Sequence, residues 1–209
     1  MAQGYFLTGT DTDVGKTHVA VQLIERWRRD GRRVLAMKPV ASGCERAADG
    51  TLVNGDVERL VAATGQRDRE LMNPYRFEPA ISPHFAARDA GVEISLARLV
   101  EHYQSLARQA DIVLVEGAGG WLAPLSDRLD IADLAVALDL PVMLVVGMRL
   151  GCINHARLSA QAIVDRGLPL AGWIANRIDP DMARHEDNLA TLKAKIAAPL
   201  LLEVPYTGQ

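Results

Sequence analysis

A glycine-rich segment near the start of the chain could bind a polyphosphate. It reads Thr8-Gly9-Thr10-Asp11-Thr12-Asp13-Val14-Gly15-Lys16-Thr17, between the apolar run Tyr5-Phe6-Leu7 and an amphipathic run. In this order of strand, loop and helix, backbone N–H groups can surround phosphate oxygens, and Gly15 lets them come close. Lys16 can reach the terminal phosphates, and the Thr17 hydroxyl can bind Mg²⁺. The alternative is an ordinary polar connection between a strand and a helix.

Two carboxylates could complete a metal site beside this loop. Glu116 closes the apolar run Ile112-Val113-Leu114-Val115 and precedes the glycine-rich segment Gly117-Ala118-Gly119-Gly120. An acidic residue at the end of a buried strand beside a phosphate loop is a usual second contact for Mg²⁺, and glycines let phosphate approach it. Asp56 follows Asn54-Gly55 at the start of an expected helix. It could bind the metal or simply cap that helix.

A second lysine, Lys38, ends another apolar run and precedes Pro39-Val40-Ala41-Ser42-Gly43. Because the carboxyl ends of parallel strands share one edge of a sheet, Lys38 should lie near Lys16. Two ammonium groups there could neutralise charge that develops during phosphoryl transfer. The alternative is a lysine that extends along the strand end into water. Ser42 could bind a substrate with its hydroxyl or stabilise a turn.

The elements that would position these residues alternate between short apolar runs and longer amphipathic ones. This pattern predicts a single doubly wound α/β domain over residues 1–209, with a mostly parallel sheet, helices on both faces and a P-loop NTPase-like start. The expected strands are Tyr5–Thr8, Val34–Lys38, Asp111–Glu116, Val142–Val146, Ala171–Ala175 and Leu200–Val204. The expected helices are Lys16–Arg29, Asp56–Thr64, Leu96–Ala110, Ile131–Leu138, Asn154–Arg166 and Met182–Ala197. The irregular stretch between residues 41 and 83 should carry functional loops.

Composition narrows the class of protein. Apolar residues make up 49% and charged residues 23% of the 209 residues, as in ordinary globular α/β proteins. The net charge of −3 indicates neither a nucleic acid nor a membrane as partner. Five arginines between residues 26 and 33 should form a solvated helix end, where cations complement the helix dipole. With two cysteines in no metal or redox spacing, and neither a signal pattern nor a membrane-spanning run, the expected location is cytoplasmic.

Six ordered motifs resemble those of the dethiobiotin synthetase family, and they span nearly the whole chain. They are residues 8–17, Lys38-Pro39-Val40-Ala41-Ser42-Gly43, Asn73-Pro74-Tyr75, Ser82-Pro83-His84, Val115-Glu116-Gly117-Ala118-Gly119-Gly120-Trp121 and Leu150-Gly151-Cys152-Ile153-Asn154-His155-Ala156. The resemblance implies a ligase of biotin biosynthesis that closes a ring at the expense of ATP. CO₂ would add to one amine of 7,8-diaminopelargonate as a carbamate, which would attack the γ-phosphate of ATP. The second amine would then displace phosphate from the carbamic-phosphoric anhydride to give dethiobiotin.

The resemblance also implies a role for each candidate residue. The residues around the nucleotide would be Asp13, Val14, Gly15, Lys16, Thr17, Asp56, Glu116, Gly117, Ala118, Gly119, Asn176, Pro205 and Tyr206. The catalytic residues would be Lys16 and Lys38, and the Mg²⁺ ligands Thr17, Asp56 and Glu116. The substrate-binding residues would be Thr12, Lys38, Ser42, Gly151, Cys152 and Asn154. The helix start at Gly151–Asn154 would come from the partner subunit of a two-fold homodimer, with Asn154 as its N-cap.

Some features depart from the family pattern. Asp13 stands where the family commonly has Glu. The sequence ends at Gln209, soon after Pro205, where similar proteins continue into a further helix, so either the nucleotide site is less enclosed or the sequence is incomplete. Asn176-Arg177-Ile178-Asp179 resembles the guanine-reading motif of GTPases, and we interpret it as a chance match before a helix that starts at Asp179-Pro180. The rival function is a partition- or nitrogenase-type ATPase that acts as a nucleotide switch. Asp11 occupies the place of the signature lysine of that class, which argues against it.

Overall fold

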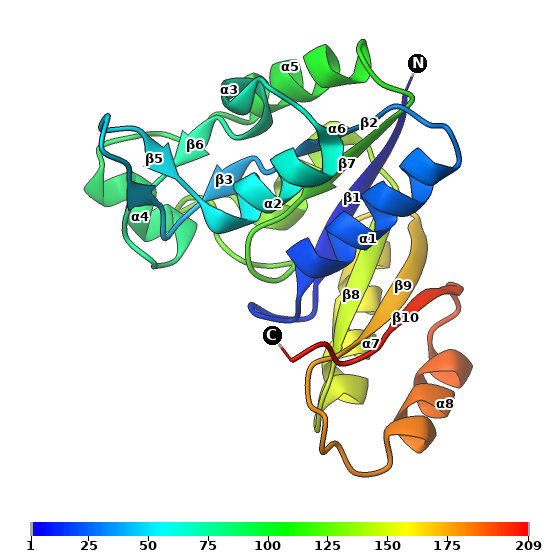
Figure 1. Ribbon diagram of the computed structural model, residues 1–209. Helices are drawn as coiled ribbons and strands as arrows, with labels where there is room; N and C mark the ends of the chain where they lie inside the picture. The colour runs from blue at the N-terminus through cyan, green and yellow to red at the C-terminus, as the bar shows by residue number, and fades with distance from the viewer. Residues whose placement is uncertain (1, 209) are drawn as a thin grey trace.

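The centre of the computed structural model, which describes residues 2–208, is a six-stranded parallel sheet (Figure 1). Across the sheet the strands are β10 (Leu200–Val204), β9 (Leu170–Arg177), β8 (Val142–Met148), β1 (Gln3–Gly9), β7 (Ile112–Glu116) and β2 (Val34–Met37). Each lies on one of the predicted apolar runs. The register pairs Leu7 of β1 with Glu116 of β7, so the carboxyl ends of these strands meet at one edge.

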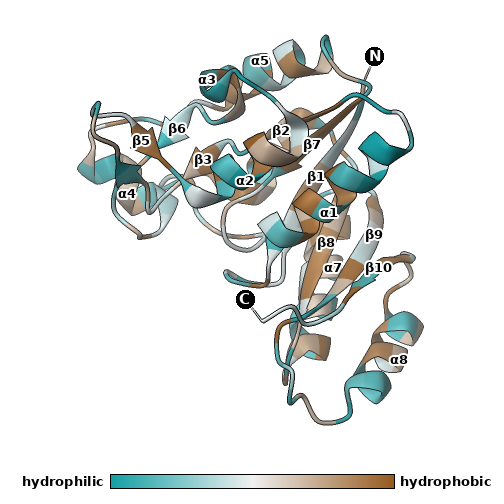
Figure 2. Cartoon of the chain, in the orientation of Figure 1, coloured by the Kyte–Doolittle hydropathy of each residue, from teal (hydrophilic) through white to brown (hydrophobic). Residues whose placement is uncertain are grey.

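Two layers of helices cover the sheet because successive strand residues point to opposite faces. In β1, for example, Phe6 and Leu7 belong to two separate hydrophobic clusters. The cluster of Phe6 contains residues of α5 (Leu96–Ala107), α6 (Ile131–Leu138), α7 (Cys152–Asp165) and α8 (His185–Lys195). The cluster of Leu7 contains residues of α1 (Lys16–Arg29) and α2 (Gly55–Thr64). Figure 2 shows apolar strands between helices that carry hydrophilic residues, which confirms the predicted doubly wound fold.

The irregular stretch between β2 and α5 contains short elements that the sequence does not reveal. They are β3 (Val40–Ala41), β4 (Glu45–Arg46), β5 (Leu52–Val53), α3 (Arg69–Met72), β6 (Tyr75–Arg76) and α4 (Pro83–Asp89). β3 pairs with β6 and β4 pairs with β5. Two-residue strands and a one-turn helix are too short to produce a readable periodicity. Their pairing holds the chain that follows β2 in place.

Two predicted boundaries are wrong for reasons of backbone hydrogen bonding. β2 ends at Met37, not at Lys38, because the Lys38 N–H leaves the sheet and donates to the Met72 carbonyl at 2.9 Å. The helix predicted from Asn154 begins earlier, at Cys152, and its N-cap is Gly151 with a φ of 93°. Asn154 therefore lies inside the first turn of α7 and is not the N-cap.

The last predicted helix also starts later than expected. α8 begins at His185, after Arg184 in the left-handed region with a φ of 57°. Asp179 instead accepts a hydrogen bond from the Asp181 N–H in a turn, so the segment Asp179-Pro180 does not initiate the helix. The prediction failed because an aspartate before a proline is common both in turns and at helix starts.

No helix within residues 2–208 combines the length and apolar character needed to cross a membrane. Cys44 and Cys152 are buried free thiols, and burial raises the pKa of both above the ordinary value for cysteine. Both thiols are therefore protonated and poorly reactive at neutral pH. The cytoplasmic location stays a prediction.

Candidate active site

A cavity of about 950 Å³ lies where β1, β2 and β7 end. Its size is typical of sites for small molecules, and its place at the carboxyl ends of the strands is the usual one in doubly wound folds. The predicted residues that line it are Thr12, Asp13, Gly15, Lys16, Thr17, Lys38, Ser42, Asp56, Glu116, Ala118, Gly119, Asn176 and Tyr206. The fold thus brings together residues that are up to 194 positions apart, from Thr12 to Tyr206.

The phosphate loop reaches the cavity through the start of α1. Gly15 is the N-cap of α1 with a φ of 79°, and no side chain caps this helix end. A Cβ on Gly15 would lie 2.2 Å from Nδ2 of Asn176, so no larger residue fits. Asn176 also donates to the Val14 carbonyl at 2.8 Å. The uncapped N–H groups of the first turn are therefore available to an anion in the cavity.

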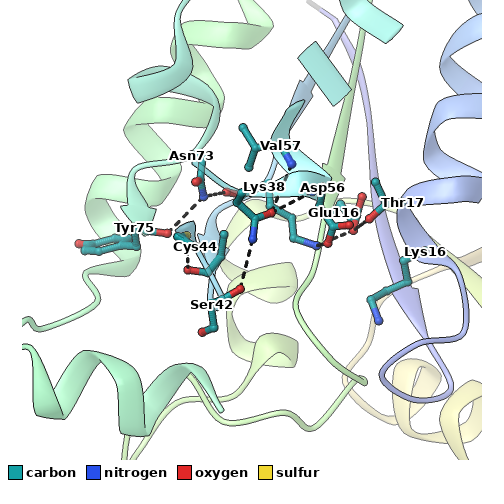
Figure 3. A network of polar contacts seen from close by, with 12 residues as sticks. Lys16, Thr17, Lys38, Ser42, Cys44, Asp56, Val57, Asn73, Tyr75 and Glu116 are labelled. Atoms are coloured by element: carbon teal, nitrogen blue, oxygen red, sulfur yellow. Dashed lines mark hydrogen bonds and ion pairs between the residues drawn. The ribbon is translucent and has the colours of Figure 1, made fainter. Parts of the chain in front are cut away.

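The Lys38 ammonium group is held between two carboxylates (Figure 3). Its Nζ lies 3.0 Å from Oδ2 of Asp56 and 2.5 Å from Oε1 of Glu116. The Thr17 hydroxyl donates to the same Glu116 oxygen at 2.7 Å. Lys38 is 5% exposed and Glu116 is 1% exposed, so this ion pair is buried. The arrangement joins β7, α2 and α1 to the chain after β2.

The two carboxylates decide the charge of Lys38. Burial alone would lower the Lys38 pKa, but the charges of Glu116 and Asp56 outweigh it and raise the pKa above its ordinary value. Burial would raise the Asp56 pKa, and the Lys38 charge outweighs this in turn and lowers it. Lys38 and Asp56 are therefore both charged at neutral pH.

Lys16 lies in the same cavity in a different electrostatic state. Within residues 2–208 no carboxylate lies within ion-pair distance of its Nζ, which donates to the Asp11 carbonyl at 3.0 Å. Burial, followed by the charge of Lys38, lowers the Lys16 pKa from 10.5 to about 8. The charges of Glu116, Asp56 and Asp13 offset this only in part, and an anion in direct contact with Lys16 would relieve the remaining cost.

Glu116 retains a second oxygen that could bind a cation. Its Oε2 is buried and has no hydrogen-bond partner among the described residues. Together with the Thr17 hydroxyl and Asp56 it forms a set of oxygen ligands, the kind that Mg²⁺ prefers. In the described part of the chain no group of three or more His, Cys, Asp and Glu side chains could hold a metal. A cation here would therefore need further ligands from outside the protein.

Two buried asparagines position the site, and neither had a role predicted from the sequence. Asn73 donates through Nδ2 to the Lys38 carbonyl at 2.5 Å and to the Tyr75 carbonyl at 3.2 Å. Asn54 is the N-cap of α2 and accepts the Asp56 N–H at 3.0 Å. The capping role that Asp56 could have had therefore belongs to Asn54, and the Asp56 carboxylate faces Lys38. The motifs Asn73-Pro74-Tyr75 and Asn54-Gly55 were the available signals.

The remaining candidates do not line the cavity. They are Val14, Gly117, Pro205, Gly151, Cys152 and Asn154. The Val14 side chain is buried, so only its backbone could meet a ligand. Cys152 is likewise buried, in the core beneath α7. The start of α7 follows β8 at the same edge of the sheet, but within one chain it forms no part of this cavity.

Comparison with known proteins identifies close relatives. The chain is 54% identical over 207 residues to the ATP-dependent dethiobiotin synthetase BioD of Aromatoleum aromaticum, covering 99% of this chain and 92% of the relative. It is 56% identical over 203 residues to the protein of the same name from Pseudomonas aeruginosa, covering 96% and 89%. The profile of a family described as an AAA domain matches residues 3–209.

Solved structures of other proteins share the fold. A ParA family ATPase from Chlorobium tepidum aligns with a TM-score of 0.59 at 16% identity, covering all of this chain and 86% of that one. The septum site-determining protein MinD from Pyrococcus horikoshii aligns with a TM-score of 0.59 at 17% identity, covering 98% and 82%. Likeness at such low identity indicates a common P-loop NTPase-like architecture and nothing about activity.

The different states of the two lysines lead to a prediction about stability. Without nucleotide, Lys16→Met should raise the free energy of unfolding at pH 7, by up to about 3 kcal/mol, because the variant no longer buries an unpaired charge. The folded pKa of about 8 lies below the unfolded value of 10.5, so the cost is complete below pH 8 and disappears as the pH rises toward 10.5. In urea unfolding measurements, the stability that Lys16→Met gains over the native protein should therefore decrease between pH 8 and pH 10.5.

Lys38→Met is the matched control for this measurement. It should lower the stability at pH 7, because it leaves the Glu116 carboxylate buried without its partner. Destabilisation by both substitutions to a similar extent would contradict the assignment of an unpaired charge to Lys16.

Proposed function

We propose, from the premise that this chain belongs to the family of ATP-dependent dethiobiotin synthetases, that the cavity beside the phosphate loop is where their ring closure takes place. The chain is an ATP-dependent cyclo-ligase of biotin biosynthesis. The observation that carries the location is the buried Lys38, paired with Glu116 and Asp56 beside the uncapped start of α1. This site combines two ammonium groups with an anion-binding helix end.

The nucleotide would lie along the phosphate loop. The backbone from Asp13 to Thr17 would hold the phosphates, and Asn176 and Tyr206, which line the same cavity, would meet the base and its surroundings. Asn176 uses its Nδ2 to bind the Val14 carbonyl, which leaves its Oδ1 to accept a hydrogen bond. Adenine offers an amino group at the edge where guanine offers a carbonyl oxygen. The second N–H of Nδ2 could also donate to guanine, so this contact fits either base; the assignment of ATP rests on the family, and the segment 176–179 stays interpreted as a chance match.

The diamine would react with CO₂ between the two lysines. One amine adds to the carbon of CO₂ and loses a proton, which gives a carbamate. A carbamate oxygen attacks the γ-phosphorus as the bond to ADP breaks, and the second amine then attacks the carbamate carbon and expels phosphate. Carbamate and triphosphate are both anions that must come into contact, and Lys16 and Lys38 supply the positive charge that makes this possible. Thr12 and Ser42, also in the cavity, would bind the substrate.

Mg²⁺ would be held by Thr17, Asp56 and Glu116 together with the phosphates. The partnerless Oε2 of Glu116 supports this assignment, since a cation would satisfy it. When bound, the ion would neutralise charge on the phosphates. Lys38, which already bridges both carboxylates, would keep them ionised and oriented toward the cavity.

The dimer would complete the substrate site. Leu150, just before α7, is 92% exposed, and Leu158 within α7 is 62% exposed. Exposed apolar side chains grouped around one helix are typical of surfaces that meet a partner. The start of α7 from Gly151 to Asn154 does not line the cavity of its own chain, so it is free to serve the cavity of the partner. Its N–H groups would receive the distant carboxylate of the diamine.

The proposed reaction is tested by Lys38→Ala. In the native protein, ADP release should require both the diamine and bicarbonate. The variant should release ADP about 100 to 1000 times more slowly, because it lacks a charge that acts as the carbamate attacks, while ATP binding changes much less. ATP binding measured by calorimetry shows that the variant is folded. ADP release without the diamine would instead indicate the nucleotide switch, and near-normal turnover of the variant would remove Lys38 from the reaction.

The metal assignment is tested by Glu116→Gln. The variant should need a higher Mg²⁺ concentration for half-maximal activity, because an amide lacks the charge of the carboxylate. Glu78→Gln, which changes an exposed carboxylate paired with Arg46, is the control and should titrate like the native protein. The same titration curve for all three proteins would contradict the proposed ligand set.

The shared site is tested by mixing subunits. Asn154→Asp should weaken binding of the diamine through repulsion of its carboxylate, without affecting ATP binding. Lys38→Ala and Asn154→Asp are each prepared and confirmed to be nearly inactive, and then combined in one dimer. If each site uses two chains, the mixed dimer has one intact site and recovers activity. If verified mixed dimers stay at the parental level, the sites lie within single chains.

A further inference from the structure

A second cavity, of about 610 Å³, lies at the edge of the sheet where β2 begins, opposite to the edge that carries the ATP site. The C-terminal ends of α1 and α2 border it, together with the loops that follow them. In Figure 1 this is the region between the far end of α1, α3 and the start of β2. We call it the arginine cavity after its lining residues Arg28, Arg32, Arg33 and Arg67.

The four guanidinium groups have little opposing charge. None of the ion pairs formed within residues 2–208 involves them. Arg28 donates to the Ala63 carbonyl at the end of α2, and the other three have no carboxylate partner in that part of the chain. Asp68 is the one acidic residue of the described lining, and its carboxylate accepts the Leu71 N–H at 2.9 Å.

The partial negative charges at the C-termini of α1 and α2 neutralise only part of the positive charge of these arginines. The C-termini of α1 and α2 each carry about half of a negative charge. With Asp68, they oppose about two of the four positive charges. The lining carries four arginines against one acidic residue, and Asp111, which accepts the Arg33 N–H at 2.8 Å, adds a second carboxylate beside it, whereas the whole chain has a net charge of −3. A solvated helix end therefore explains only some of the arginines in this region.

A buried hydrogen-bond donor in the wall of the cavity also indicates a ligand with acceptor oxygens. Gln66 is 7% exposed, and its Oε1 accepts the Ala36 N–H of β2 at 3.1 Å. Its Nε2 is buried and has no hydrogen-bond partner among the described residues. Buried donors of this kind are rare in folded proteins unless a ligand or ordered water serves as acceptor. Gln66 lines the arginine cavity, so a turn of its amide would let a bound acceptor oxygen supply that partner.

We infer that the arginine cavity is a second ligand site, separate from the ATP site, that binds a small organic phosphate. Guanidinium groups match phosphate oxygens in a two-pronged geometry, which makes arginine the preferred residue for such ligands. Leu35, Leu71 and Leu106 give the cavity an apolar side for the organic part of the molecule. The volume is sufficient for a ligand of nucleotide size.

Pyrophosphate is the probe for this site, and calorimetry without added metal is the measurement. It is titrated into Lys16→Ala, in which phosphate binding at the loop is weakened. This chain should bind pyrophosphate at one site with a dissociation constant below about 1 mM. Adding Arg32→Gln and Arg67→Gln should weaken the binding by about tenfold or more. Arg32→Lys with Arg67→Lys should cause an intermediate loss of affinity, because lysine keeps the positive charge but lacks the two-pronged guanidinium group.

The matched control is Arg26→Gln with Arg29→Gln. It removes the same number of positive charges, both from the last turn of α1, but neither residue lines the cavity. Its affinity for pyrophosphate should stay within about twofold of the parent. In the native background, Arg32→Gln with Arg67→Gln should leave diamine-dependent turnover unchanged, which verifies the fold. Lack of saturable binding to Lys16→Ala, or an equal loss in the control, would overturn the inference without affecting the proposed ring closure.

Discussion

A buried ammonium group destabilises the fold unless anions lie against it, and the rest of the active site is arranged so that Lys38 has such anions. Removing an ion from water costs several kcal/mol, so the carboxylates must be in place when the chain folds. Glu116 comes from β7 and Asp56 from α2, and Thr17 of α1 holds the shared Glu116 oxygen. The ion pair therefore fixes three elements relative to the chain that leaves β2. Asn73 fixes the backbone of Lys38 itself.

Lys16 shows what happens when the same requirement is not met. It lies in the same cavity, but a backbone carbonyl is its only polar contact within the described residues. The protein therefore holds an unfavourable charge at the place where we propose that phosphates bind, and such a ligand would relieve it. A buried charge without an ion-pair partner is commonly found at functional sites, where the loss of stability is accepted because the charge is needed to bind a ligand. The two lysines differ only in what the fold places beside them.

The sequence was a good guide wherever one physical rule decided the outcome. Continuous apolar runs located all six strands of the sheet. Because parallel strands end at a common edge, Lys38 and Glu116 were both expected beside the phosphate loop, where they lie. Helix caps were predicted poorly, because a cap depends on backbone conformation. Gly151 holds the N-cap position expected for Asn154, and Asn54 holds the one that had been left open for Asp56. The arginine cavity could not be predicted, since it forms only when the loops after α1 and α2 come together.

Asn176 connects the end of β9 to the glycine-rich loop after β1. Its side chain occupies the space that a Cβ on Gly15 would need, and it holds the Val14 carbonyl. The glycine is therefore required twice, for its positive φ and for the close packing of this amide. The position of the Asn176 side chain and that of the loop are therefore fixed by the same contact. The end of β9 and the loop that follows β1 thus form one surface, although 161 positions separate Gly15 from Asn176.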